Sequence, residues 1–323
     1  MSTNKLLEIQ NLNIVYKTDY GVVRAVNDLN LVVDRGETLG LVGETGAGKT
    51  TTSLGILRLV PDPPGEIVSG EILLGGEDII PKTLAEMRRI RGNRVSMIFQ
   101  DPMTSLNPVM PVVEQIAEVI MLHEKLSAKN AELKAIEMLG KVGIGAERAN
   151  EYPHQFSGGM RQRVVIAIAL ACNPELLIAD EPTTALDVTI QAQVLELMRG
   201  LKKDYNTAMI MITHDLGIVA DICDRVAIMY AGSIVEMAGK KELFTAPKHP
   251  YTIGLFGSIP DISTDDHMLN PIPGLMPDPA KLPSGCPFHP RCEKTLPECT
   301  QKPPKLTKLS EHHFVKCTLF GDS

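Results

Sequence analysis

Residues 43–50 read Gly43-Glu44-Thr45-Gly46-Ala47-Gly48-Lys49-Thr50 and match the pattern G-x-x-x-x-G-K-[ST]. The sequence predicts a strand before this stretch, over Glu37–Val42, and a helix after it, over Thr50–Leu59, ended by the proline-rich residues 61–65. Glycines in such a loop let backbone amides surround nucleotide phosphates, and a lysine adds a positive charge. The stretch therefore predicts a phosphate-binding loop (P-loop) in an α/β core.

A second apolar strand, predicted over Leu176–Ala179, ends in two adjacent carboxylates, Asp180 and Glu181. A buried sheet delivers such acids to the edge where nucleotides bind. Position assigns the roles: Asp180 would hold Mg²⁺ through its water shell, and Glu181 would orient or deprotonate the attacking water. Thr50 would ligate the same Mg²⁺ through its hydroxyl.

Gln100 and His214 each follow a strand-like segment, Arg94–Phe99 and Met209–Thr213. A glutamine there can contact the metal and the attacking water, and a histidine can hydrogen-bond the γ-phosphate without needing a charge. Taken alone, either residue is more often a surface or capping residue, so both count only as members of the set. We predict Glu181, His214 and Gln100 as catalytic residues, with Gln100 also a Mg²⁺ contact.

A Ser-Gly-Gly turn opens a predicted helix before the acid pair, in Phe156-Ser157-Gly158-Gly159-Met160-Arg161-Gln162-Arg163. A serine hydroxyl and amides without side chains form an anion site at a helix N-terminus, because free N–H groups and the helix dipole both favour negative charge. The anion expected there is a nucleotide phosphate. This arrangement separates one class of ATPase from the rest.

Composition narrows the class of protein. The chain has 323 residues, 44% of them hydrophobic, which suits a globular protein that can hold two domains. Its longest apolar run is the nine residues Val164–Cys172, whereas spanning a bilayer takes about 20. The N-terminal residues 1–10 contain an acid where a signal peptide needs a continuous apolar segment, so we expect a cytoplasmic protein.

Charge argues against nucleic acid as a partner. The net charge is −7, from 32 basic and 39 acidic residues, and gives no general attraction to nucleic acid or anionic lipid. The densest basic group contains Arg88, Arg89, Arg91 and Arg94, and is interpreted as a solvated helix face.

The amino-acid composition of the chain changes near residue 245, beyond which proline becomes frequent. Residues 107–152 are predicted to be mostly helical, and short buried strands are predicted at 208–212 and 226–230. Thirteen of the 23 prolines lie between Pro247 and Pro304, which argues against a long helix there. We predict a nucleotide-binding domain over 1–245, with a helical subdomain at about 100–160, and a C-terminal extension over 246–323.

Together, these motifs resemble those of ABC-transporter nucleotide-binding domains, over residues 4 to about 245. The P-loop, Gln100, the Ser-Gly-Gly turn, the acid pair, Asp187 in Ala185-Leu186-Asp187, and His214 occur in that family's order and approximate spacing. The resemblance implies a P-loop NTPase (RecA-like) α/β core with an antiparallel β subdomain and an α-helical subdomain, followed here by the Pro/Cys-rich extension. It also implies ATP hydrolysis, with Tyr16 stacking on adenine.

The resemblance implies two sets of nucleotide contacts. The ATP-binding set on this chain is Tyr16, Gly43, Glu44, Thr45, Gly46, Ala47, Gly48, Lys49, Thr50 and Thr51. The set that contacts the nucleotide of a partner subunit is Ser157, Gly158, Gly159 and Asp187.

The likeness narrows to dipeptide, oligopeptide and nickel importers. Residues 97–108 resemble the segment around the glutamine in that subgroup, and His249–Leu255 with the proline-rich tail resemble its C-terminal region. Residues 159–163 and 181–189 are similar to the D-type subunit. The resemblance implies an F-type ATP-binding partner, two permease subunits, an extracytoplasmic peptide-binding protein, and a peripheral place on the cytoplasmic face of the membrane.

Four cysteines cluster in the tail: Cys286, Cys292, Cys299 and Cys317, separated by five, six and seventeen residues. In a cytoplasmic protein such thiols are likelier to bind metal than to form disulfides, and four thiolates suit either tetrahedral zinc or an iron–sulfur cluster. Spacing leaves both open, and His289, His312 and His313 leave a mixed Cys/His zinc site open too. Cys172 and Cys223 are predicted to be small buried hydrophobic residues.

The tail also resembles that of peptide-importer ATPases carrying a [4Fe-4S] cluster, which implies such a cluster on the four cysteines, with zinc as the alternative. Because the tail has many prolines and little core of its own, we interpret the cluster as a structural staple and not as a redox regulator. A rival function remains: a soluble ABC ATPase that works in iron–sulfur assembly or on nucleic acid, with the cysteines as cargo or sensor ligands. A nickel-chelate importer subunit is a further alternative.

Overall fold

The computed structural model describes residues 4–184, 186–258 and 272–321, and the chain divides into two compact units. The first unit contains Val33–Thr38 and Leu74–Thr213, with the first residues up to Leu7. The second unit contains Glu8–Val32, Leu39–Leu73 and the chain from His214 onward. The acid pair therefore belongs to the first unit, and the P-loop and the C-terminal extension belong to the second.

The first unit contains three parallel strands, in which β7 (Leu176–Asp180) lies between β6 (Val95–Ile98) and β8 (Ala208–Ile212). Every residue of β7 and β8 is buried. Nearly continuous apolar runs are expected of parallel strands that are covered on both faces. The strands predicted at 94–99, 176–179 and 208–212 are confirmed.

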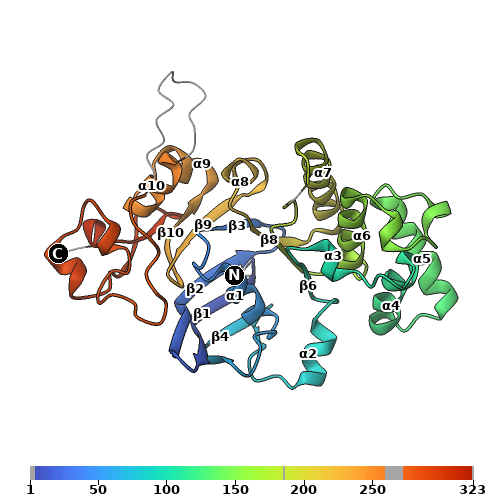
Figure 1. The fold of residues 1–323 in the computed structure, drawn as a ribbon, viewed down its shortest axis with the longest axis horizontal. Coiled ribbons are helices and arrows are strands. Elements are labelled where there is room, and N and C mark those ends of the chain that lie inside the picture. The colour runs from blue at the N-terminus through green and yellow to red at the C-terminus, as the bar shows by residue number, and fades with distance from the viewer. Residues whose placement is uncertain (1–3, 185, 259–271, 322–323) are drawn as a thin grey trace. The chain divides into compact units, whose positions relative to one another are not determined.

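Helices fill the rest of the first unit. The green helices in Figure 1 are α4 (Val112–Glu124) and α5 (Ala128–Lys141), which pack on each other and on α6 (Gly158–Leu170). The long helix α7 (Val188–Tyr205) also packs on α6. The mostly helical prediction for 107–152 is confirmed. The remaining elements are β5 (Glu77–Asp78), α2 (Leu84–Ile90), α3 (Pro102–Ser105), η1 (Ala146–Arg148) and η2 (Pro153–Gln155).

The apolar run Val164–Cys172 lies mainly in α6, where its burial explains its composition. Val164, Ile166 and Ala167 are fully buried, and Cys172 is 8% exposed. Cys223, which caps the C-terminus of α8 in the second unit, is 1% exposed. Both cysteines are the buried hydrophobic residues that the sequence predicted. Among the described helices, none combines the length and apolar character needed to cross a bilayer.

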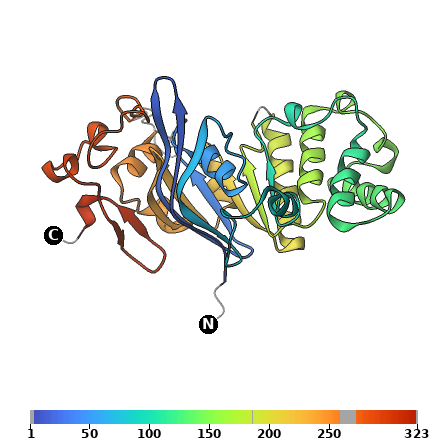
Figure 2. The same cartoon turned by 90° about the horizontal axis from the view of Figure 1, so that it is seen from below.

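In the second unit, one sheet places β1 (Lys5–Thr18) between β2 (Gly21–Asp34) and β4 (Gly65–Leu74). The turn at Asp19-Tyr20 joins β1 and β2 into the long blue hairpin of Figure 2. Only antiparallel strands can be joined by so short a connection. The alternating apolar residues Leu7, Ile9, Leu12 and Ile14 are buried in β1, as a strand with one covered face requires.

A second set of strands in this unit carries the P-loop. Here β3 (Thr38–Val42) runs parallel to β9 (Arg225–Tyr230), and β10 (Ser233–Gly239) pairs antiparallel with β9. The extension then adds β12 (Phe314–Lys316) beside β10, and β11 (Leu306–Lys308) beside β12. The sequence predicted β3 and β9 but not the other three. The division into 1–245 and 246–323 stays a prediction.

The helices of the second unit are short. After the P-loop, α1 (Lys49–Ile56) ends three residues before the predicted Leu59, and Arg58 takes a left-handed φ of 50°. The end of α1 was therefore predicted wrongly. The other helical elements are α8 (Leu216–Ile222), α9 (Lys240–Thr245), α10 (Pro250–Gly257), η3 (His289–Arg291), η4 (Pro297–Thr300) and η5 (Thr318–Phe320).

Candidate functional site

The P-loop connects β3 to α1, and its backbone requires glycine. Gly46 and Gly48 have φ values of 83° and 104°, which side chains rarely adopt. A Cβ at Gly43 would lie 2.2 Å from the carbonyl oxygen of Met229, and one at Gly48 would lie 2.4 Å from that of Ala25. The loop is thus packed tightly against its own unit.

Lys49 folds back on the P-loop that precedes it. Its Nζ donates to the carbonyl oxygens of Gly43 at 2.7 Å and Glu44 at 3.0 Å. Helix α1 begins at Gly48, and no side chain caps its first turn. A helix start of this kind leaves backbone N–H groups to bind an anion, and the lysine charge lies beside them. Tyr16 lies half-buried on β1 in the same unit.

The acid pair lies at the end of β7 in the first unit, where Asp180 is the last residue of the strand and Glu181 follows it. Asp180 is 4% exposed, and Glu181 has a left-handed φ of 48°, unusual for a residue with a side chain. The Glu181 amide donates to the carbonyl oxygen of Ile212 at 2.8 Å. This bond ties the strained residue to β8, and strain of this kind gathers at functional sites.

Two side chains hold the carboxylate of Glu181. Gln100 Nε2 donates to Glu181 Oε2 at 3.1 Å, and the Thr184 hydroxyl donates to the same oxygen at 2.9 Å. The structure therefore brings Gln100 and Glu181 together, as members of one site should be. Sequence reasoning missed Thr184, although its position three residues after Glu181 in a turn was a usable signal.

His214 lies two residues after the end of β8, is exposed, and begins the C-terminal segment of the second unit. The next residue, Asp215, caps α8 by accepting hydrogen bonds from the amides of Gly217 and Ile218. The proposed contact of His214 with a γ-phosphate stays a prediction.

The Ser-Gly-Gly turn and Asp187 both form helix N-termini in the first unit. Ser157 caps α6 by accepting from the amide of Met160, and Asp187 caps α7 by accepting from the amide of Ile190 at 2.9 Å. A Cβ at Gly159 would lie 2.4 Å from Ile190 Cγ2, so the two turns pack closely. Gly158 is less crowded, with Leu186 Cδ2 at 3.8 Å. Ala185 lies outside the described residues.

The four tail cysteines line one small cavity, together with His249 and Phe288. Burial, together with the charges of the neighbouring cysteines, raises the pKa of Cys286 to about 11, although a hydrogen bond from the Phe288 amide works against this. Burial also raises the pKa of Cys317. Without a cation, the Cys286 and Cys317 thiols stay protonated at neutral pH.

His249 is an unusual member of that cavity lining. Its Nδ1 accepts from the amide of Tyr251 at 3.0 Å, and burial lowers its pKa to about 3, so the ring is neutral. Its Nε2 is buried and has no hydrogen-bond partner among the described residues. An unpaired buried polar atom in the lining of a cavity shared with four thiols fits an additional bound group.

The predicted metal site receives no direct support. Among the described residues, no group of three or more His, Cys, Asp and Glu side chains could hold a metal ion as arranged. Of the histidines considered for a mixed site, His289 lines the cavity, whereas His313 contacts Glu236 and Glu242 instead. The four cysteines therefore share one cavity lining without being arranged in the coordination geometry of a metal site.

Comparison with known proteins gives a consistent result. Residues 26–184 match the family model "ABC transporter", and residues 235–299 match "Oligopeptide/dipeptide transporter, C-terminal region". The chain is 52% identical to the oligopeptide transport ATP-binding protein OppD of Bacillus subtilis (strain 168), covering 98% of this chain and 89% of that protein. It is 48% identical to the dipeptide transport ATP-binding protein DppD of the same organism, covering 98% and 95%.

Solved structures agree on the fold. The ATP-binding cassette MJ0796, in a dimeric post-hydrolysis state bound to ADP and Pi, matches with a TM-score of 0.66 and 25% identity, over 73% of this chain and 99% of that one. The cbiO1 protein of Clostridium perfringens matches with a TM-score of 0.65 and 26% identity, over 76% and 92%.

Proposed function

Because the chain belongs to the ATP-binding subunits of the oligopeptide and dipeptide ABC transporters, we propose that its ATP hydrolysis drives import of di- and oligopeptides. The single observation that carries the chemistry is the Glu181 carboxylate, which is held by Gln100 and Thr184 at the end of β7. A carboxylate fixed in this way can orient an attacking water or accept its proton. The predicted α/β ABC cassette fold and the peptide-importer family are confirmed.

Nucleotide binding begins at the P-loop in this proposal. Backbone amides of the P-loop and the Lys49 ammonium would neutralise the phosphates, while Tyr16 would stack on the adenine. Thr50, Gln100 and Asp180 would hold Mg²⁺, which supplies charge neutralisation on the phosphates when bound. Their hydroxyl, amide and carboxylate oxygens are the ligand types that this ion prefers.

Hydrolysis then depends on positioning rather than on a covalent nucleophile. Glu181 would take the proton of the attacking water, and His214 would hydrogen-bond the γ-phosphate. Gln100 Nε2 already donates to the Glu181 carboxylate. Gln100 would therefore hold this carboxylate in one orientation while it also contacts the Mg²⁺. The required parts are donors, one acid and a metal, as in other phosphoryl transfers.

We also propose that this chain completes the nucleotide site of an F-type partner. Ser157, Gly158, Gly159 and Asp187 would contact the partner's nucleotide, because they present two helix N-termini that lie close together. The similar MJ0796 cassette is dimeric in its solved structure, and that likeness supports such pairing. Two permease subunits and an extracytoplasmic peptide-binding protein would complete the assembly, with this chain peripheral on the cytoplasmic face.

A copurification experiment tests this assembly. The tagged chain, coexpressed with candidate permease and F-type subunits, is expected to purify as a complex that hydrolyses ATP. Purification with nucleic acid or iron–sulfur assembly proteins, and without permease subunits, would refute the importer proposal. If a nickel chelate stimulates ATP hydrolysis and peptides do not, the proposed cargo becomes the nickel chelate.

We further propose that Cys286, Cys292, Cys299 and Cys317 hold a [4Fe-4S] cluster, with zinc as the alternative. The support is their shared cavity and the unpaired Nε2 of His249 in its lining. A bound metal would stabilise the thiolates, which burial otherwise disfavours. Iron and zinc analysis with an absorption spectrum of anaerobically purified protein tests this: iron with a charge-transfer band is expected, and zinc alone or no metal would contradict the cluster.

A further inference from the structure

Arg291, in the cysteine-rich tail, contacts the P-loop directly. Its Nη1 lies 3.1 Å from both carboxylate oxygens of Glu44, across 247 residues of sequence. The Arg291 side chain is 7% exposed and that of Glu44 is 29% exposed, so solvent screens this pair only partly. Both residues belong to the second unit.

The guanidinium is held in place by the packing around it. Its Nε donates to the carbonyl oxygen of Pro273 at 2.9 Å, and its Nη1 lies 3.4 Å from the Tyr230 hydroxyl. The Cζ atom lies 5.9 Å and 6.0 Å from the ring centroids of Tyr230 and Phe288, at the limit of cation–π contact. Arg291 therefore presents a fixed charge to the loop.

Glu44 is also held at its backbone. Its amide donates to the Tyr251 hydroxyl at 2.9 Å, and its carbonyl oxygen accepts from Lys49 at 3.0 Å. Tyr251 is fully buried in α10 and packs on Tyr230 at 4.6 Å between ring centroids. Residues beyond the motif thus fix one P-loop residue at its side chain and at its amide.

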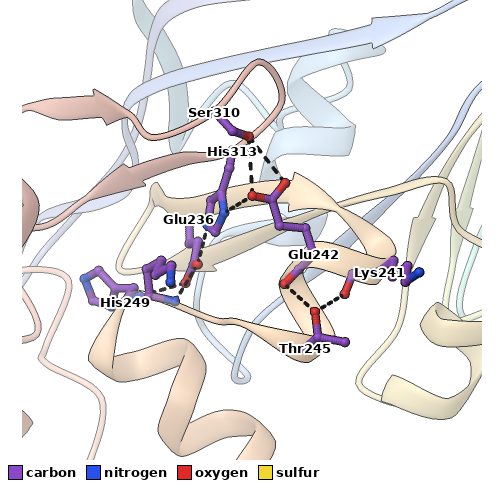
Figure 3. A network of polar contacts seen from close by, with 8 residues as sticks. Glu236, Lys241, Glu242, Thr245, His249, Ser310 and His313 are labelled. Atoms are coloured by element: carbon purple, nitrogen blue, oxygen red, sulfur yellow. Dashed lines mark hydrogen bonds and ion pairs between the residues drawn. The ribbon is translucent and has the colours of Figure 1, made fainter.

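Contacts other than the Arg291–Glu44 pair also dock the tail. As Figure 3 shows, His313 reaches from the tail to Glu236 of β10 and Glu242 of α9, at 2.8 Å and 3.0 Å. Glu236 also accepts from the amides of Lys248 and His249, and β12 pairs with β10. The tail is anchored there by other residues, so the Arg291 contact calls for another explanation.

We propose that Arg291 is a positioning residue for nucleotide binding: it neutralises the Glu44 carboxylate and fixes it within the P-loop. This proposal rests on the proposed function. A carboxylate in the loop that cradles phosphates repels them unless a cation compensates it, since like charges in a partly buried site repel strongly. The fixed guanidinium of Arg291 supplies this compensation, and its rigid geometry holds the side chain in one orientation.

Binding measurements on a double-mutant cycle test the role. The affinity of the full chain for the Mg²⁺ complex of a non-hydrolysable ATP analogue would be measured by calorimetry for wild type, Arg291→Met, Glu44→Gln and the double variant. We expect Arg291→Met to raise Kd about tenfold when Glu44 is present, and less than about twofold in the Glu44→Gln background. Arg291→Lys should give an intermediate loss of nucleotide affinity, because lysine restores the positive charge but not the planar, fork-shaped guanidinium.

Lys316→Met is the matched control, because Lys316 is a tail cation that pairs with Asp28 at 3.6 Å and not with the P-loop. It should leave Kd unchanged. Melting temperatures of all variants separate a folding defect from a binding defect: a tenfold loss that Glu44→Gln does not relieve would make Arg291 merely structural. An unchanged Kd in folded Arg291→Met would overturn the proposal, whereas a wild-type chain that binds no nucleotide would overturn the proposed function instead.

Discussion

The P-loop and the C-terminal extension belong to the same unit but are specified in different ways. The P-loop conformation follows from its own glycines, two of which have positive φ values. The extension consists of helix α10, short 3-10 turns and two three-residue strands, and distant partners hold it, such as Glu236 for His313 and Glu44 for Arg291. Local sequence thus encodes the chemistry, while long-range polar contacts decide where the tail lies.

The largest expected effect is a loss of ATP hydrolysis in a protein that still folds. Glu181→Gln preserves the shape of the side chain but removes its basicity. Turnover of ATP by the assembled complex should fall by about 10²–10⁴-fold, while nucleotide binding is retained. Steady-state hydrolysis measured beside a binding titration checks this, and unchanged turnover would remove Glu181 from the mechanism.

The second prediction concerns the stability of the C-terminal extension, tested by a substitution outside the nucleotide-binding motifs. Glu236 is fully buried and accepts from two amides and lies against His313. Glu236→Ala leaves these groups unpaired, which should destabilise the fold by about 3 kcal/mol.

Thermal unfolding and hydrogen exchange at β12 measure that loss. Glu311→Ala is the control, because Glu311 is an exposed glutamate of the same tail and should change stability by less than about 0.5 kcal/mol. Equal melting temperatures for the two variants would mean that the network does not anchor the tail.

Within the P-loop, two glycines separate conformation from packing. Both have positive φ values, but a Cβ at Gly46 meets nothing within 4 Å, whereas one at Gly48 would meet a backbone oxygen at 2.4 Å. Gly48→Ala should therefore cost about 2 kcal/mol more than Gly46→Ala in unfolding free energy. Similar losses in the two variants would show that the backbone angle alone matters.

The smallest expected effect concerns pH. Burial alone would raise the pKa of Glu175, but hydrogen bonds and charge from Arg94 and Arg35 outweigh it and lower that pKa. The folded state therefore holds the carboxylate ionised more strongly than the unfolded state does, so its stabilisation is present above about pH 4.5 and is lost as pH falls through the lowered pKa. Near pH 7, the free energy of unfolding of the wild type should exceed that of Glu175→Gln by about 1 kcal/mol.

Chemical unfolding of both proteins at several pH values measures this difference. It should shrink steadily as the solution is acidified below about pH 4.5. A difference that is constant with pH would show that the ionised pair contributes nothing.

Much of the site was predictable because its motifs are contiguous. The strand before Gly43 and the buried strand before Asp180 are apolar runs that end at polar residues, and both are confirmed. Arg94 was grouped with a solvated helix face, but it follows α2 and pairs with Glu175, 81 residues away. That prediction was wrong for Arg94 because no local pattern encodes a contact over such a distance.

The tail illustrates the same limit. Strands β11 and β12 have three residues each, too short for a periodic signal, and exist through pairing, β12 with β10 and β11 with β12. The contacts of Arg291 and Tyr251 with Glu44 could not be predicted from the residues that flank them in the sequence. In contrast, the clustering of four cysteines around one cavity was suggested by their spacing in the sequence.

The most direct test of the central claim is ATP-dependent peptide uptake by the reconstituted transporter. Proteoliposomes would contain this chain, its F-type partner and the permease subunits, with the binding protein and a labelled peptide outside and MgATP inside. The account predicts uptake that requires ATP and falls to background with Glu181→Gln. Peptide uptake that is equal with and without ATP, or unchanged by that substitution, would contradict it.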